Sequence, residues 1–497
     1  MGDIGKLRLV GAAAGVFFTA AFILSLDYHA FPWFDELATA DTAANCALHT
    51  EWRSQVWQYS YCPLHLILLT WWLSFFGVSH LSVCSFDVLL AGVGFFVLLD
   101  LLCSRRVLKT IASVLLFTLL YWCGWRFSEV VVLGRVDMLV LVCTVMLCRA
   151  FIYDGKDHGF LNWSVFLWAF LTMLSGIYSI PPLVVAWGAV VMLDRQNRKR
   201  HLIRAGAAMA GFVAAFAVAS LYYFHHRLMI QFVYSFFMSS TTLSGAKKDW
   251  LILLKDAYSC DIMALVLTGC VAVAAILKKN RRLLLSALLV GSIPLVMVAA
   301  GRYCFYYSWL FYLPVVVLVM MCIVRVWVKV GIVAMIAVFS VKMAVEADNM
   351  SSRRDIVKKA QMFINTNEKE FAPGCDVVMV EPMVVDEKIN VKALYYPLVR
   401  LGVRLWNVEI PFDPQRTFEE HVRSGVSRLL GAGRRAEAVA DVILKLDKPY
   451  EKWPDEGFLI CRGDGLYEQV IPIFNRNGQR LKLIDRKGEL VLAKFTR

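Results

Sequence analysis

Asp35 and Glu36 form an acidic pair directly after the first hydrophobic segment, in the stretch FPWFDELATADTAANCALHTEW. A carboxylate beside a membrane is costly to desolvate, so an acidic pair at this position is a candidate functional site. Carboxylates can take a proton from a hydroxyl group or bind a hard cation. The pair therefore indicates chemistry at a membrane surface.

The composition identifies the class of protein in which this pair must be positioned. Of the 497 residues, 59% are hydrophobic, 13% are aromatic and only 18% are charged. A chain this apolar is a polytopic membrane protein rather than a soluble one. The formal net charge is +13, but many of the lysines and arginines form short clusters between apolar runs, where they orient a membrane protein. No nucleic-acid partner is predicted.

Apolar runs of spanning length are spread over the first two thirds of the chain. They occur near residues 8–26, 61–77, 83–103, 107–124, 136–152, 160–175, 178–193, 203–223, 260–277, 283–300, 304–324 and 328–345. The first run follows a basic start and has no clear cleavage site after it, so we interpret it as a retained anchor.

The basic clusters at 104–106, 194–200 and 278–282 decide which of these runs cross the membrane. If all of them crossed, these clusters would lie opposite the basic N-terminus and would violate the positive-inside rule. The run 61–77 is barely long enough to span and carries Pro63, so we interpret it as an interfacial helix.

About eleven transmembrane helices then remain, with every basic cluster on the cytoplasmic side. Three parts of the chain face the other side: a first loop over 27–82, the segment around Arg135 and Asp137, and the tail that begins near residue 346. Residues 1–345 are thus predicted to form a transmembrane domain.

The tail, residues 346–497, has a mixed composition typical of a separate α/β domain. Strand-like runs alternate with helical stretches there. The strand-like runs are CDVVMV, GVRLWNVEI, GFLICR and LKLIDRKGELVLAKF, and the helical stretches are RRDIVKKAQMFINTN and FEEHVRSGVSRLL. We predict a soluble extracytoplasmic domain.

More charged and aromatic residues fall on the same predicted face as the acidic pair. Arg135 and Asp137 lie in WRFSEVVVLGRVD. The remaining candidates are His225, His226 and Arg227 at the end of one span, and Arg302 and Tyr303 at the start of another.

These motifs resemble the GT-C superfamily of polyprenyl-phosphate-sugar-dependent glycosyltransferases, which includes protein O-mannosyltransferases and the lipid A aminoarabinose transferase. In that superfamily an acidic residue or pair opens the first outer loop, as Asp35-Glu36 does here, and a Pro-Leu stretch follows, as in YCPLH at 61–65. Gly134-Arg135-Val136-Asp137 looks like the later acidic motif, and the stretch from Gly301-Arg302-Tyr303 to Pro314 looks like the basic-aromatic segment. The resemblance covers about residues 1–345.

The resemblance implies a GT-C-like fold and transfer of a sugar from a polyprenyl-phosphate donor, undecaprenyl-linked in a bacterium, to a lipid, glycan or protein acceptor. The reaction passes through an oxocarbenium-like transition state while the phosphate leaves. Asp35 is the candidate base, with Glu36 and Asp137 as further catalytic candidates. Arg302, Tyr303, Arg135, His225, His226 and Arg227 are the candidates for binding the phosphate and the substrate. The expected location is the cytoplasmic membrane, among its lipids.

Two positions depart from the superfamily pattern. Cys62 stands where a Pro-Pro pair would begin, and Asp87 stands where many members carry an arginine. The subfamily and the substrate therefore stay open.

Each candidate also has a plain structural alternative. Asp35 could cap a helix, and Glu36 would then be a favourable charge in its first turn. Arg135 and Asp137 could form a local ion pair. Arg302 could extend to the lipid headgroups, beside an aromatic belt that includes Tyr303. The cluster at 225–227 could be the polar end of a span.

No cofactor is required by the sequence. Asp35, Glu36 and Asp137 would offer oxygen ligands to a divalent cation, but their spacing does not demand one. Two other classes of function remain open as alternatives: a non-catalytic envelope assembly protein that works through its tail, and a transporter or flippase. The transporter is disfavoured because no second half mirrors the first and the charges lie mainly at helix ends.

Overall fold

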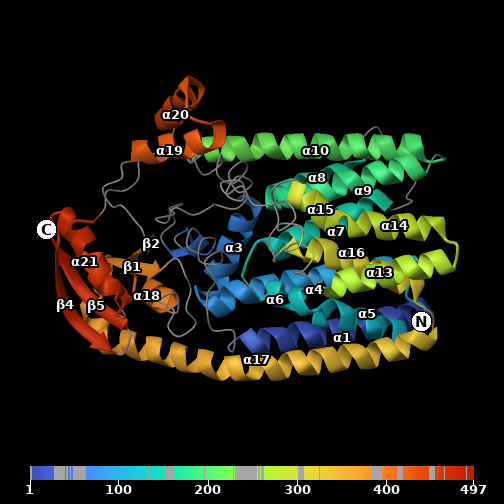
Figure 1. Ribbon diagram of the computed structural model, residues 1–497, viewed down its shortest axis with the longest axis horizontal. Helices are drawn as coiled ribbons and strands as arrows, with labels where there is room; N and C mark the ends of the chain where they lie inside the picture. Colours follow the sequence, from blue (N-terminus) through green and yellow to red (C-terminus); the bar gives the residue numbers. More distant parts are fainter. Residues whose placement is uncertain are drawn as a thin grey trace.

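The computed structural model describes residues 3–26, 40, 43–44, 46–48, 63–132, 134–152, 162–194, 196–227, 229, 255, 258, 262–299, 307–323, 325–382, 394–410, 418–446, 454–463, 465–487 and 490–497. A bundle of helices occupies one side of the molecule, and a five-stranded sheet occupies the other (Figure 1). We call the end of the bundle nearer the sheet the sheet end.

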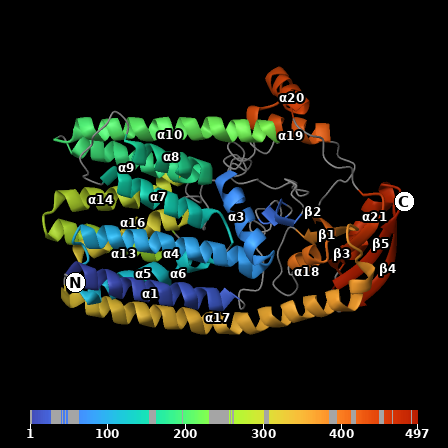
Figure 2. The same cartoon turned by 180° about the vertical axis from the view of Figure 1, so that it is seen from behind.

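The bundle helices run side by side along the long axis of the molecule, as both views show (Figures 1 and 2). They are α1 (Asp3–Ser25), α4 (His80–Ser104), α5 (Ile111–Cys123), α7 (Asp137–Ile152), α8 (Trp163–Ser175), α9 (Ile180–Leu193), α10 (Arg198–His225), α13 (Ile262–Leu277), α14 (Arg281–Gly291), α15 (Ile293–Ala299), α16 (Trp309–Cys322) and α17 (Arg325–Asn367). A helix is therefore present at each predicted span.

Several of these helices have the length and composition to cross a bilayer. Among the described residues, four stretches meet both criteria: α1, α4, α10 and Arg281–Ala299. Shorter apolar helices lie between them in the sequence. The chain is a multi-pass membrane protein, while the number of crossings and their direction stay predictions.

Ion pairs join the helices at the end opposite the sheet. Asp100 accepts from the Arg8 guanidinium at 2.7 Å and from the Arg149 guanidinium at 2.8 Å. One carboxylate thus links α1, α4 and α7, at a level where the side chains are partly exposed and the pairs avoid the full cost of burial.

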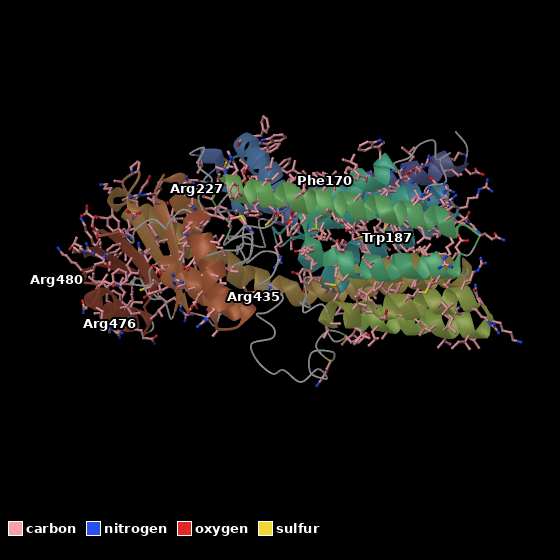
Figure 3. The ribbon with its side chains drawn as sticks, turned by 90° about the horizontal axis from the view of Figure 1, so that it is seen from above. Phe170, Trp187, Arg227, Arg435, Arg476 and Arg480 are labelled. Carbon is pink, nitrogen blue, oxygen red and sulfur yellow. The ribbon has the colours of Figure 1, made fainter. Side chains whose placement is uncertain are left out.

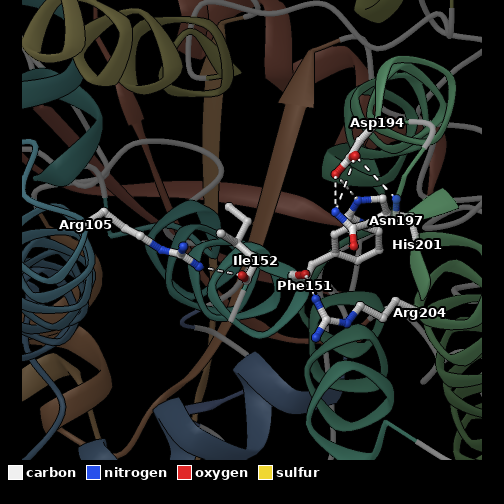
Figure 4. Close-up of polar contacts among 7 residues, drawn as sticks. All are labelled: Arg105, Phe151, Ile152, Asp194, Asn197, His201 and Arg204. Carbon is white, nitrogen blue, oxygen red and sulfur yellow. Dashed lines mark hydrogen bonds and ion pairs between the residues drawn. The ribbon is translucent and has the colours of Figure 1, made fainter. Parts of the chain in front are cut away.

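Arginines also satisfy the last carbonyl groups of α7 at this end (Figure 4). Arg105 donates to the carbonyl oxygen of Ile152 at 2.6 Å, and the buried Arg204 donates to that of Phe151 at 2.6 Å. Helix ends leave such carbonyls without partners inside the helix, and lipid offers none.

A second contact in Figure 4 lies between α9 and α10. Asp194 lies 3.0 Å from His201, and this hydrogen bond, helped by Asn197, lowers the pKa of the Asp194 carboxyl. Arg105 and Asp194 belong to two of the basic clusters that the sequence places on one side of the membrane. Both clusters lie at the end opposite the sheet.

The predicted interfacial segment forms α3 (Pro63–Phe76) at the sheet end. It buries Leu66, Leu69 and Leu73 on one face. The indole of Trp72 donates to the carbonyl oxygen of Ser82 at 2.7 Å, which holds α3 against the start of α4. The helix is thus confirmed, and its interfacial position stays a prediction.

The sheet contains β1 (Asp376–Pro382), β2 (Arg404–Ile410), β3 (Gly457–Arg462), β4 (Arg480–Lys487) and β5 (Leu490–Thr496), in the order β2-β1-β3-β5-β4. The first three strands are parallel, and β5 is antiparallel to both β3 and β4. Successive residues of a strand point to opposite faces, so Val378 and Val377 belong to different cores. One face packs on α21 (Leu466–Arg476).

The other face of the sheet belongs to a core shared with the bundle. This core contains Val377 and Leu492 from the sheet, Phe363 from α17, and Leu69 and Phe86 from α3 and α4. The short helix α18 (Tyr395–Arg400) joins it, and Arg400 donates to the carbonyl oxygen of Val78 at 3.3 Å. Because α17 continues unbroken for 43 residues, the bundle and the sheet share one helix across the predicted boundary at 345.

The predicted strands of the tail are confirmed as strands of this sheet. The two predicted helical stretches are confirmed as the C-terminal part of α17 and as α19 (Phe418–Leu430). The sequence did not predict α18, α21 or α20 (Arg434–Leu446). Helices α19 and α20 form a hairpin with its own small core of Val422, Val426, Ala436, Ala440 and Ile443.

The contact between α8 and α10 depends on Gly211. A Cβ atom there would meet the carbonyl oxygen of Phe166 and would lie 3.0 Å from the Cβ of Ala169. We expect Gly211→Ala to lower the free energy of unfolding by about 1–3 kcal/mol through overpacking. Gly206→Ala, on the same helix with open space around it, is the control. Thermal unfolding of the two purified variants in detergent should separate them, and equal midpoints would contradict this account.

Candidate active site

Asp137, Arg135 and Tyr178 form a buried polar cluster at the sheet end of the bundle. The Arg135 Nε donates to one carboxylate oxygen of Asp137 at 2.8 Å, and the Tyr178 hydroxyl donates to the other at 2.8 Å. Asp137 is 0% exposed and Arg135 is 3% exposed. Burial strengthens their attraction, since little water screens it, and makes each charge dependent on its partner.

The local sequence explains how Arg135 and Asp137 face each other two residues apart. Gly134 has a φ of +66°, a conformation that favours glycine, so the chain turns sharply before α7. Asp137 is the first residue of α7, where the positive end of the helix dipole stabilises its charge. The ion pair that was the structural alternative is therefore present.

Tyr178 reaches this pair from the start of α9. It lies in a short 3-10 helix, Ile177–Ser179, and Pro181 and Pro182 stand in the first turn of α9, where their missing amide hydrogens cost little. Gly176 allows the approach to α7, because a Cβ atom there would lie 2.8 Å from the Val140 side chain and 2.9 Å from the Tyr178 ring.

The Tyr178 ring also packs on Tyr307, with 4.4 Å between the ring centroids. Tyr307 lies just before α16 and directly follows residues 300–306, which are outside the described part of the chain. Arg302 and Tyr303 fall in that gap. Tyr307 belongs to the predicted basic-aromatic segment, which runs to Pro314, so the described cluster contacts that segment through Tyr178.

A second buried cation, Lys342, contacts the segment that precedes this cluster in the sequence. Helix α6 (Trp125–Val131) precedes the turn at Gly134, and its Ser128 and Glu129 meet Lys342 of α17. Lys342 is 4% exposed, donates a hydrogen bond to the Ser128 hydroxyl and lies 3.9 Å from the Glu129 carboxylate. Helix α17, which leads toward the sheet, is thereby fixed to the segment that precedes Asp137.

His65 and Asp87 face each other between α3 and α4. His65 belongs to the Pro-Leu stretch YCPLH, and Asp87 is the residue that stands where many superfamily members carry an arginine. Their nearest side-chain atoms are 3.8 Å apart, and both residues are 1% exposed. Burial lowers the pKa of His65 to about 3, so the imidazole is neutral near pH 7. The contact is therefore a polar one rather than an ion pair at that pH.

The other predicted site residues divide into two groups. Asp35, Glu36, Arg302 and Tyr303 lie outside the described residues. His225, His226 and Arg227 lie at the sheet end of α10, where the His226 ring is 4.6 Å from Tyr222 and 5.0 Å from His225.

Within the described part of the chain, no group of three histidine, cysteine or acidic side chains could hold a metal ion. Asp137 is a poor ligand for a cation, because each of its oxygens already accepts a hydrogen bond and the Arg135 guanidinium would repel the metal. The described residues therefore do not suit a metal at Asp137.

Sequence reasoning missed Tyr178 and Lys342. Both lie in apolar runs, where a tyrosine suggests a membrane-interface belt and a lysine suggests a helix end. The pattern Gly-Ile-Tyr-Ser-Ile-Pro-Pro at 176–182 was the available signal, since a glycine and two prolines fix a bend beside the tyrosine.

Two solved structures share this arrangement of helices and sheet. One is ArnT from Cupriavidus metallidurans bound to undecaprenyl phosphate, with 11% identity, a TM-score of 0.60 and coverage of 99% of this chain and 98% of that one. The chain has the ArnT fold. The same protein in the apo state matches with 12% identity, a TM-score of 0.58 and coverage of 97% and 98%. No protein-family profile and no curated sequence matches the chain.

The ArnT fold confirms the resemblance to the GT-C superfamily at the level of the fold. The match extends over the C-terminal sheet as well as the bundle, because it covers nearly the whole chain. The quoted motifs thus led to the correct fold.

The cluster around Asp137 makes a prediction about stability. Arg135→Met should cost about 3–5 kcal/mol, because it leaves a buried carboxylate without its counter-ion. Tyr178→Phe should cost about 1–3 kcal/mol, because one hydrogen bond to that carboxylate is lost. Reversible unfolding in mixed detergent micelles measures both.

A double-mutant cycle tests whether these costs arise at Asp137. Tyr178→Phe combined with Asp137→Asn should deviate from additivity by more than about 0.5 kcal/mol. Tyr258→Phe combined with Asp137→Asn is the control and should be additive, since the Tyr258 hydroxyl donates to the carbonyl oxygen of Gly291 instead. Additive costs for the Tyr178 pair would show that the two side chains act separately.

Proposed function

We propose that this protein is an integral-membrane glycosyltransferase that takes a sugar from a polyprenyl-phosphate donor. The observation that carries the proposal is the match over 99% of the chain to a fold solved with undecaprenyl phosphate bound. Its second support is the buried cluster of Arg135, Asp137 and Tyr178 at the end of the bundle where the resemblance places the chemistry.

In this proposal Asp35 takes the proton of the acceptor hydroxyl, whose oxygen bonds to the anomeric carbon of the sugar as the bond from that carbon to the phosphate breaks. The leaving phosphate gains charge, so a cation beside it stabilises the transition state. Arg302 is the proposed contact, with Arg135 as a second one, because a guanidinium can donate two parallel hydrogen bonds to a phosphate. Glu36, Tyr303 and the cluster at 225–227 are proposed to line the substrate site.

Asp137 fits a positioning role better than that of the base. Asp137 is 0% exposed, and both of its oxygens already accept hydrogen bonds from the protein. The bond from the Arg135 Nε restrains the guanidinium, and the bond from Tyr178 holds the Asp137 carboxylate. We therefore propose that Asp137 and Tyr178 orient Arg135.

The acceptor is proposed to be a hydroxyl-bearing lipid, glycan or protein that reaches the sheet end of the bundle. The polyprenyl chain would lie along the apolar flanks of the helices, within the membrane. No step is assigned to a metal.

The proposal predicts transfer by the purified protein from radiolabelled polyprenyl-phosphate sugars to an acceptor in membrane extract. Asp35→Asn, which removes the base with little change of shape, should reduce the rate by about two or more orders of magnitude. Asp194→Asn, the same chemical change at the end opposite the sheet, should leave it unchanged. Full activity in a folded Asp35→Asn variant would overturn the role of Asp35.

The outcome also separates this proposal from the alternatives. A non-catalytic assembly protein would transfer no sugar from any donor, and a transporter would move a labelled lipid without forming a new glycosidic bond.

We further propose that the protein lies in the cytoplasmic membrane with its sheet on the outer side. The basic clusters at the opposite end support this direction, since such clusters face the cytoplasm. A reporter fused at Arg497 should then be accessible from outside the cell. A reporter fused after Lys279, in the turn between α13 and α14, should be cytoplasmic, and the reverse pattern would contradict the proposed topology.

A further inference from the structure

The hairpin of α19 and α20 ends in an exposed turn that we call the hairpin tip, residues 430–435. Gly431 and Gly433 have φ values of +78° and +150°, which allow the tight reversal between the helices. Leu430 is 49% exposed, and every residue from 431 to 435 is exposed. The tip thus presents an apolar side chain beside Arg434 and Arg435.

The charges of the hairpin are unevenly distributed between its tip and the rest of α19 and α20, which we call the shaft. On the shaft, Arg423 binds both Glu419 and Asp441 at 2.8 Å, so these acidic groups are neutralised within the hairpin. Arg434 and Arg435 make no ion pair with any residue in the described part of the chain. Glu437 lies one turn further along α20. The uncompensated charge at the tip is therefore positive.

The position of the tip relative to the bundle indicates what it can reach. Helix α10 exposes Val213, Leu221 and Phe224 to its surroundings, at 65%, 66% and 52%, so it lies at the lipid-facing edge of the bundle. The hairpin lies at the sheet end of α10 in both views of the ribbon (Figures 1 and 2). Figure 3 shows Arg435 on the side of the hairpin that faces the bundle, and Arg227 near the end of α10.

We infer that the hairpin tip docks on the anionic phosphate headgroups of the leaflet nearest the sheet. The hairpin stands just beyond the sheet end of α10 (Figure 1), so headgroups at the level where α10 ends would lie beside it. Two arginines suit phosphate groups because the guanidinium donates paired hydrogen bonds, and basic residues are attracted to an anionic membrane surface. Leu430 then enters the apolar boundary beneath the headgroups.

This inference does not rest on the proposed glycosyl transfer, because it requires only that the bundle spans a membrane. It assigns the hairpin a role in fixing the sheet above the bilayer. Because the attraction is electrostatic and the tip is exposed, salt should weaken it.

The test places an environment-sensitive fluorescent amino acid at Ala432 of the full chain in lipid nanodiscs. Quenching is measured with lipids that carry a nitroxide on the headgroup. Nanodiscs of phosphatidylcholine alone are compared with nanodiscs that contain about 30% phosphatidylglycerol. We expect at least a two-fold stronger quenching in the anionic nanodiscs, and a loss of this difference in 0.5 M salt.

The arginines are tested by the double change Arg434→Gln and Arg435→Gln, which should reduce quenching in anionic nanodiscs to the level in phosphatidylcholine. Arg476→Gln and Arg480→Gln remove the same charge from α21 and β4, on the far side of the sheet in Figure 3, and should leave quenching unchanged. If the double variant unfolds, Arg435→Gln alone should give an intermediate value.

Three results would overturn the inference. Quenching that is absent in both lipids would mean that the tip does not reach the headgroups and faces another partner. Equal quenching in both lipids would remove the requirement for anionic headgroups. An equal loss in the control at Arg476 and Arg480 would show that only the total charge matters.

Discussion

A helix in lipid has no water to satisfy its backbone polar groups or its charges, and this constraint separates the polar groups of the chain into two sets. At the end opposite the sheet, Asp100 binds Arg8 and Arg149, and arginines bind the last carbonyls of α7. At the sheet end, the buried cluster at Asp137 and the Lys342 contacts are formed. The ion pairs of Asp100 are partly exposed, whereas Arg204 in the first set and Arg135, Asp137 and Lys342 in the second are buried.

The burial of the second set determines how a site can be built at the sheet end. A carboxylate that is fully buried needs its partners, so the positions of Arg135 and Tyr178 are tightly specified. The turn at Gly134 and the close approach at Gly176 position their backbones in turn. Helix α17 adds a connection from this region to the sheet through Lys342 and Phe363. A shift of the sheet would therefore act on α6, the helix that leads to Arg135.

The sequence was sufficient to predict what depends on local pattern. Apolar runs and basic clusters predicted the helices, alternating residues predicted the strands, and short motifs at 35–36 and 134–137 led to the fold. It could not predict contacts between distant segments, such as Tyr178 with Asp137 or Lys342 with Ser128. The residues around one partner contain no pattern that identifies the other partner. The short helix α18 was missed for the same reason. Tyr395 and Leu398 are buried by contacts with the shared core, and the helix is too short to show a hydrophobic periodicity in the sequence.

The shared core also has a consequence for biosynthesis. Arg400 binds the carbonyl of Val78, and the two residues are separated by 322 positions in the chain. The apolar face that α3 and α4 present to the sheet is made early, while the strands that cover it are made last. At ordinary rates of translation, about 15–60 s pass between the synthesis of this face and the synthesis of the segments that bury it. During that interval it is the surface most exposed to aggregation, so chaperone binding or slow release from the translocon at this stage would govern the yield of folded protein.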